Sequence, residues 1–202
     1  MNEDLNISKV EALCRDLHSY KAEILDYTKK PLRIASGLNS DYERVKIYRL
    51  QDPKDTERFR CGFCWDIVCL ALSKLRNLGY DAYAVYIERA GDDSDFPENH
   101  VTVVFNDEAG KMIFEASTGE IYGPFLSDSE MLLKLSEIMK SFSVEDIDIQ
   151  DLNFYKIDQY PEVGCTVQEF IRQARKGKLL SFDDAKTFSK FDSLFEQTMR
   201  NY

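Results

Sequence analysis

The pattern of apolar residues predicts a central helix that begins at the run Cys61-Gly62-Phe63-Cys64-Trp65-Asp66. The following segment is apolar around most of its circumference and reaches Gly79, a residue type that commonly ends helices. Its apolar members are Trp65, Ile67, Val68, Leu70, Ala71, Leu72, Leu75 and Leu78. A helix with so little polar surface belongs inside a core, so we expect it to hold Cys64 rigidly at its N-terminal tip.

Alternation of apolar and polar residues predicts strands after this helix. Residues 82–88 alternate as in a buried strand, and residues 100–117 form a hairpin signal around a turn at residues 106–110. If Asn106 pairs with Lys111, one face of the hairpin is wholly apolar. The apolar pairs in this register are Phe105 with Met112, Val103 with Phe114, and Val101 with Ala116. A slip by one residue would destroy this match.

The same register brings polar residues together on the other face of the hairpin. Glu115 lies diagonal to His100, within reach of a long side chain, and Ser117 lies directly opposite His100. The hydrophobic pattern therefore predicts, without any reference to function, that the imidazole and the carboxylate are neighbours.

Helical patterns flank this core on both sides. A capping box at Ser8 opens an amphipathic pattern through Tyr27, which predicts a helix of about five turns. Beyond residue 125, helices are predicted to begin near Ser127, Thr166 and Ser181, with a short strand at residues 153–157. We expect a single α+β domain over residues 1–202. Its parts are a core at residues 58–125, an N-terminal helical lead-in at residues 1–57 and a helical C-terminal appendage at residues 126–202.

The amino-acid composition limits which partners and which cellular compartment we expect. The 36 acidic and 26 basic residues give a net charge of −10, which disfavours binding to nucleic acid or to an anionic membrane. The sequence has no apolar leader and no membrane-spanning window, so we expect a soluble cytoplasmic protein, with export independent of a signal left open. Five cysteines, an odd number, favour free thiols over a disulfide framework.

Three residues have the chemistry of a cysteine nucleophile with its base and acid. The unpaired N–H groups and the positive dipole at a helix start stabilise a thiolate, which makes Cys64 the candidate nucleophile. His100 is one of two histidines in the chain, and the other, His18, is predicted to be a surface residue. We therefore predict a Cys64–His100–Glu115 triad, in which Ser117 is the alternative third member.

These residues resemble the transglutaminase-like core of the papain-like cysteine fold. In that superfamily a Gly-x-Cys-Trp motif opens the central helix, a His begins one strand, and a carboxylate, usually Asp, ends the next strand. The chain matches with Gly62 to Trp65, His100 and Glu115, and it departs in having Glu rather than Asp and in having Val101 after the histidine. The resemblance covers about residues 58–120. The papain motif itself fits less well, because Arg58 stands where papain-type enzymes have a glutamine.

The resemblance implies attack of the Cys64 thiolate on a peptide, isopeptide or glutamine side-chain amide of a protein or peptide substrate, with no cofactor or metal. The thioester would pass to water, as in a peptidase, amidase or deamidase, or to an amine, as in a transglutaminase. The backbone N–H of Cys64 would bind the oxyanion, together with the Trp65 indole or a side chain from residues 48–60.

Other interpretations remain open at this stage. The same fold could be a catalytically silent protein-binding module. The main support for this is Glu115, which stands where the family usually has Asp. Cys61 and Cys64 could form a redox pair, or zinc could be held by some of Cys61, Cys64, Cys69, Cys165 and His100. The acidic loop at residues 92–98 could be a flap or a cation site, although it matches no calcium-binding loop. Aromatic residues of the C-terminal helices could dock a protein partner.

Overall fold

A computed structural model describes residues 3–25, 29, 31–32, 48–92, 97–143 and 146–182 of the chain. The described elements are α1 (Glu3–His18), β1 (Ile24–Leu25), β2 (Pro31–Leu32), α3 (Pro53–Phe59), α4 (Cys64–Asn77), β3 (Asp81–Arg89), β4 (Asn99–Asp107), β5 (Gly110–Glu115), β6 (Glu120–Phe125), α5 (Asp128–Phe142), the 3₁₀ helix η1 (Ile149–Asp151), β7 (Leu152–Ile157), α6 (Val167–Ala174) and β8 (Lys178–Leu180). None of the described helices is long and apolar enough to cross a membrane.

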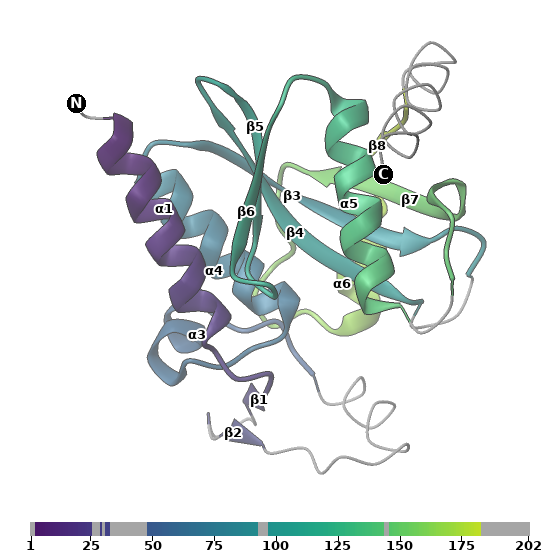
Figure 1. The fold of residues 1–202 in the computed structure, drawn as a ribbon. Coiled ribbons are helices and arrows are strands. Elements are labelled where there is room, and N and C mark those ends of the chain that lie inside the picture. The colour runs from purple at the N-terminus through teal and green to yellow at the C-terminus, as the bar shows by residue number, and fades with distance from the viewer. Residues whose placement is uncertain are drawn as a thin grey trace.

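The fold is α+β and is built on a six-stranded antiparallel sheet in the order β6-β5-β4-β3-β7-β8 (Figure 1). Two hydrophobic clusters fill the space on its two faces. One contains the buried residues of α1, α4 and α6, and the other contains those of α5. The sheet is therefore covered by helices on both faces, which explains why its central strands β3 and β4 are apolar along most of their length.

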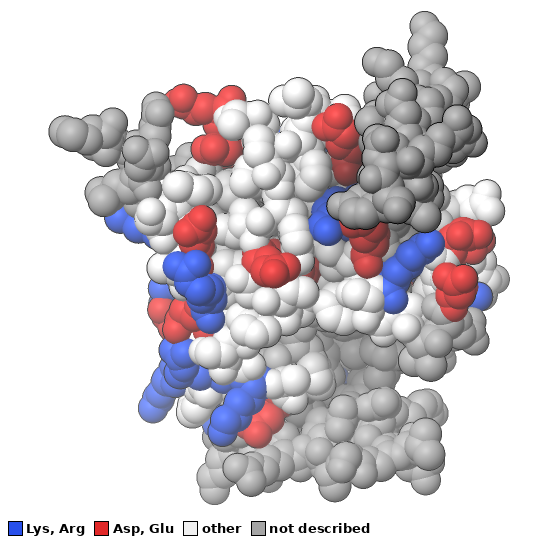
Figure 2. Space-filling model, in the orientation of Figure 1, with Lys and Arg blue, Asp and Glu red and all other residues white. Residues whose placement is uncertain are grey.

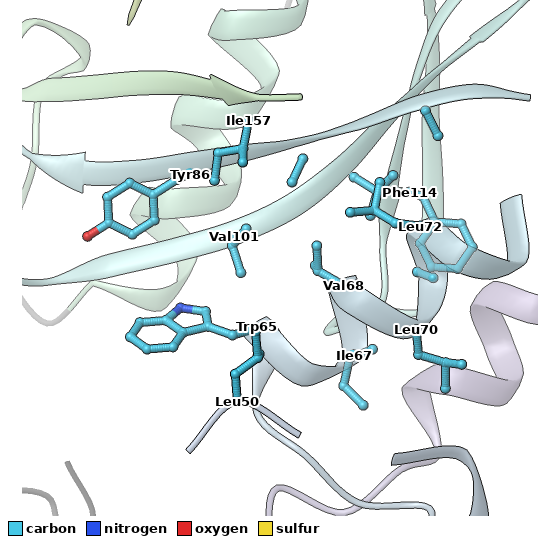
Figure 3. Packing of buried hydrophobic residues seen from close by; sticks show 14 of the residues in the cluster. Leu50, Trp65, Ile67, Val68, Leu70, Leu72, Tyr86, Val101, Phe114 and Ile157 are labelled. Atoms are coloured by element: carbon cyan, nitrogen blue, oxygen red, sulfur yellow. The ribbon is translucent and has the colours of Figure 1, made fainter. Parts of the chain in front are cut away.

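Helix α4 is the centre of the first cluster, as its apolar circumference predicts. It begins at Cys64, ends at Asn77, and is followed by Gly79 in a left-handed conformation with φ of 93°. Figure 3 shows Trp65 and Val68 between this helix and the strands that carry Tyr86 and Val101. The helix therefore cannot tilt or slide without disturbing the core, and its first residue is held in a fixed position relative to the sheet.

The hairpin register predicted from the sequence is confirmed between Val103 and Lys111, while the predicted pairings of Ala116 and Ser117 fall beyond the end of β5 at Glu115. Strands β4 and β5 pair Asn106 with Lys111, Phe105 with Met112 and Val103 with Phe114. Phe105, Val103 and Phe114 are buried in the cluster beneath α4. The apolar match thus sets the register, and the register in turn sets the positions of His100 and Glu115.

Two predictions about the flanking segments need correction. Helix α1 ends at His18 rather than continuing to Tyr27, because the chain turns and the backbone of Lys21 pairs with Arg60 and Gly62 ahead of α4. The strand predicted at residues 153–157 is present as β7, but the segment after residue 125 is not an appendage to the core, since β7 pairs with the central strand β3 and β8 pairs with β7. The helix predicted to begin near Ser181 lies mostly outside the described residues, as do residues 93–96 of the acidic loop.

The helix starts predicted at residues 127 and 166 are confirmed. Ser127 accepts a hydrogen bond from the backbone of Glu130 at the start of α5, and Thr166 forms a capping box with Glu169 at the start of α6. On the face shown in Figure 2, basic and acidic side chains lie interspersed among uncharged ones. The net negative charge is therefore not gathered into one patch on that face.

Candidate active site

Cys64 is the first residue of α4, and a buried carboxylate fixes the turn before it. Asp66 accepts hydrogen bonds from the backbone N–H of Phe63 at 2.9 Å and of Gln51 at 2.8 Å, and from the Tyr48 hydroxyl at 2.7 Å. Burial raises the pKa of Asp66 to about 6, although these hydrogen bonds act in the opposite direction. Asp66 thus fixes the start of α4, where Cys64 lies, to residues 48–51.

Close packing at Gly62 gives a first testable prediction. A Cβ atom at this position would lie 2.6 Å from the Cβ of Asp66, which is far inside van der Waals contact. We expect Gly62→Ala to displace Asp66 and to lower the free energy of unfolding by about 1–3 kcal/mol. Thermal denaturation followed by circular dichroism measures the effect, and an unchanged midpoint would contradict this packing.

His100 and Glu115 form a buried hydrogen-bonded pair at the point where β4 begins and β5 ends. The Nε2–H of His100 donates to Oε2 of Glu115 at 2.9 Å. The two residues are only 6% and 1% exposed, so the pair is shielded from water. His100 and Glu115, which the hairpin register predicted to be neighbours, are therefore joined by a direct hydrogen bond.

The electrostatics of this pair favour a charged imidazole and a charged carboxylate. Burial alone would lower the pKa of His100, but the charge of Glu115 and the hydrogen bond with the Cys64 side chain outweigh it and raise the pKa to about 10. Burial likewise tends to raise the pKa of Glu115, and the charge of His100 with hydrogen bonds from His100 and Ser117 lowers it overall. At neutral pH the site therefore holds an imidazolium facing a carboxylate.

The imidazole thus has a partner on each side. Glu115 is hydrogen-bonded to Nε2, and the Cys64 side chain lies close enough to the imidazole to raise the pKa of His100. Cys64 itself is half-buried. Because Nε2 is taken, Nδ1 is the ring nitrogen left to exchange a proton with the thiol. All three residues predicted for the triad therefore meet at one place.

Ser117 supports the carboxylate and does not replace it. Its hydroxyl and its backbone N–H, the latter at 3.0 Å, both donate to Oε1 of Glu115. Oε1 is thereby held while Oε2 faces the imidazole. The alternative in which Ser117 is the third member is not favoured, since the nitrogen it would bind is already bonded to Glu115.

The Trp65 indole is not placed to bind an oxyanion. Its N–H donates to Oδ1 of Asn99 at 3.2 Å, and its ring stacks on Phe170 of α6 with centroids 4.1 Å apart. The backbone carbonyl of Trp65 accepts a hydrogen bond from Tyr160 at 2.7 Å. Trp65 therefore has a structural role, anchoring the first turn of α4 to the C-terminal part of the chain.

Gln51 is the polar side chain from residues 48–60 that lies at the helix start. Its Nε2 donates to Oδ2 of Asp66 at 3.3 Å, the same oxygen that accepts from the backbone N–H of Phe63. Its Oε1 is buried without a hydrogen-bond partner among the described residues. This oxygen is an acceptor and could bind only a hydrogen-bond donor, whereas the amide N–H group that is not bonded to Asp66 could donate to a ligand.

Phe142, at the C-terminal end of α5, packs on the His100 imidazole with ring centroids 4.9 Å apart. It is 45% exposed, so it lies between the imidazole and solvent. Nothing in the sequence pattern indicated this contact, because α5 follows β6 and covers the opposite face of the sheet from α4. His100 is thus held between a residue from each helical layer.

A metal site built on the cysteines is not assembled in the described part of the chain. All five cysteines are free thiols, and Cys61 is fully buried while Cys64 is half-buried. Within the described residues, which include every cysteine and histidine, no three His, Cys, Asp or Glu side chains are grouped so as to hold a metal ion. Of the acidic loop, Asp92 and Glu98 are described, and the remainder of that predicted cation site lies outside the described residues.

Comparisons of the chain with protein-family models, curated proteins and solved structures found no match.

Proposed function

We propose that this protein is a cysteine-dependent enzyme with a transglutaminase-like core that acts on peptide, isopeptide or glutamine side-chain amides through a thioester. The observation that carries the proposal is the buried imidazole of His100, which is hydrogen-bonded to Glu115 through one nitrogen and whose pKa is raised by the nearby side chain of Cys64 at a helix tip. This arrangement supplies a nucleophile, a proton carrier and an orienting acid in contact with one another.

In the first half-reaction the Cys64 thiolate attacks the amide carbonyl carbon and forms a carbon–sulfur bond. The carbonyl electrons move to oxygen and return when the carbon–nitrogen bond breaks. The imidazolium of His100 gives its Nδ1 proton to the departing amine, while the Nε2 proton stays on the hydrogen bond to Glu115. The raised pKa of His100 suits this role because the proton is present at neutral pH.

In the second half-reaction water or a primary amine attacks the thioester. The attacking group gives a proton to Nδ1 of His100, and the thiolate leaves, which restores the imidazolium and the free nucleophile. Water as acceptor makes the enzyme a peptidase, amidase or deamidase, and an amine makes it a transglutaminase. No cofactor takes part in either half.

The oxyanion would be bound by the backbone N–H of Cys64 and by Gln51. The first N–H groups of a helix have no partner within the helix, so that of Cys64 is suitably placed. Gln51 donates to the same carboxylate oxygen of Asp66 as the backbone N–H of Phe63, the residue before Cys64, and it uses only one amide proton in that bond. Gln51 therefore takes the place that the sequence assigned to Trp65 or to an unnamed side chain from residues 48–60.

Removal of the Gln51 amide is a sharp test of this assignment. We expect Gln51→Ala to lower turnover by about 10²–10³-fold, the usual effect of losing one oxyanion donor. Alkylation of Cys64 by iodoacetamide builds no oxyanion, so its rate should change far less than turnover. The exposed Gln159→Ala is the matched control. Equal losses in turnover and alkylation would assign Gln51 a purely structural role.

The reaction class is tested by incubating the protein with a random-sequence peptide library, with and without a primary-amine probe. Mass spectrometry then distinguishes cleavage, deamidation and amine incorporation, and Cys64→Ala is the negative control. We expect one of these products to depend on Cys64. If none of the three depends on Cys64, the proposed catalysis is contradicted and the binding-module interpretation is favoured.

A further inference from the structure

A cavity of about 250 Å³ opens beside the nucleophile, and the triad does not use it. It lies between the last turn of α1, the first turns of α4 and the end of β5. Cys64 and Glu115 both contribute to its lining, so a group bound there would be adjacent to the reacting sulfur. The cavity is thus continuous with the site described above.

The inner wall of this cavity is apolar and closely packed. It is formed by Leu17 of α1, Ile67 and Val68 of α4, and Val101 of β4, all of which are buried in the hydrophobic core. Among the described residues, no lysine or arginine contributes to the lining. A charged group entering the cavity would lose water without gaining an oppositely charged partner, because Glu115 is already paired with His100.

Contacts with β5 hold the α1 wall in place. The thiol of Cys14 lies 3.5 Å from the carbonyl oxygen of Glu115, and Nδ1 of His18 lies 3.2 Å from the carbonyl oxygen of Ala116. A Cβ atom at Gly119, where φ is 75°, would come within 3.0 Å of the His18 ring. His18 is exposed, as the sequence predicted, and its ring also forms part of this wall.

We propose that this cavity binds an uncharged apolar side chain of the substrate, aromatic or branched aliphatic, next to the amide that Cys64 attacks. This inference rests on the proposed function and adds a specificity to it. The volume is sufficient, because an apolar protein cavity of about 150 Å³ already accommodates benzene. The apolar wall supplies the binding free energy, and the continuity with Cys64 places the bound side chain beside the scissile bond.

Affinity labelling of Cys64 tests the cavity separately from catalysis. Iodoacetamide, N-benzyl iodoacetamide and its 4-carboxybenzyl analogue share one reactive carbon, from which the thiolate displaces iodide. We expect the benzyl reagent to label Cys64 about 10–100-fold faster than iodoacetamide, because burying the ring adds binding free energy before the reaction. The rate of labelling by the benzyl reagent should saturate with its concentration. The 4-carboxybenzyl reagent should label Cys64 no faster than iodoacetamide does.

Variants with larger side chains that fill part of the cavity provide a second test of the proposed binding site. Ala116→Leu narrows it from the β5 side and Ala22→Leu narrows it at the exposed rim, so the second variant carries the test if the first does not fold. Each should reduce the benzyl-to-iodoacetamide rate ratio toward one. Leu126→Ala, at a side chain that is 85% exposed, is the control and should keep the ratio.

The outcomes separate the two proposals. Selective labelling of Cys64 by iodoacetamide, combined with a rate ratio near one in the unmodified protein, would overturn the apolar cavity and leave the proposed function intact. A ratio that stays high in both filled variants would also overturn it. Absence of selective Cys64 labelling by iodoacetamide would instead contradict the proposed function. Peptide mapping assigns each label to its cysteine.

Discussion

Replacement of Cys64 with alanine is expected to reduce turnover of an amide substrate to the background rate, a loss of at least about 10⁴-fold. The reason is that no other thiol can form the thioester at this place. Cys61, three residues earlier, is fully buried, and burial raises its pKa, which disfavours its thiolate. Steady-state kinetics of the purified variant, with folding checked by circular dichroism, measures the loss.

The matched control for this prediction is Cys61→Ala, which removes the other cysteine of the Cys-x-x-Cys pair. We expect this variant to keep most of its turnover. Equal losses from Cys61→Ala and Cys64→Ala, in variants that both remain folded, would contradict the triad and favour the redox pair that the sequence left open.

Exchange of Glu115 for glutamine is expected to lower turnover by about 10³–10⁴-fold while preserving the volume of the side chain. The carboxylate fixes the imidazole through the 2.9 Å hydrogen bond and stabilises its charge. Without that charge, the pKa of His100 falls from its raised value of about 10, since the charge of Glu115 is the largest effect that raises it. Turnover as a function of pH measures both consequences.

The sign of the pH effect follows from the role of the imidazolium. Turnover requires the protonated imidazole, so in the unmodified protein it should decline on the alkaline side only as pH rises toward about 10. In Glu115→Gln the decline should begin at lower pH. Glu120→Gln is the control, because Glu120 is an exposed carboxylate on β6 that pairs with Glu115 across the strands. An alkaline limb that does not move in Glu115→Gln would contradict the assigned role.

Local patterns in the sequence predicted the position of Cys64 at the start of a helix and the neighbourhood of His100 and Glu115. The start of α4 followed from its apolar circumference, and the register of β4 and β5 followed from the need to place Val103, Phe105 and Phe114 on one face. That register leaves only one arrangement of His100 and Glu115. Their contact was therefore predictable from hydrophobic periodicity, whereas their catalytic role remains a proposal.

Features that depend on contacts between distant segments were not predictable in the same way. The place of β7 beside β3 requires pairing across more than 60 positions of the chain, which no local pattern encodes. Gln51 and Asp66 are joined by tertiary packing, and Phe142 reaches His100 from another helical layer. The early end of α1 likewise results from backbone pairing of Lys21 with the segment before α4, which overrides the helical periodicity.

The most direct test of the central claim is site-resolved labelling of the five cysteines with a low dose of iodoacetamide at neutral pH. Intact mass and peptide mapping should show a single label on Cys64 in the unmodified protein. In a folded His100→Ala variant that selectivity should be lost, because the imidazolium no longer stabilises the thiolate. Selective labelling of Cys64 that persists unchanged in His100→Ala would contradict the pairing of the thiol with the imidazole.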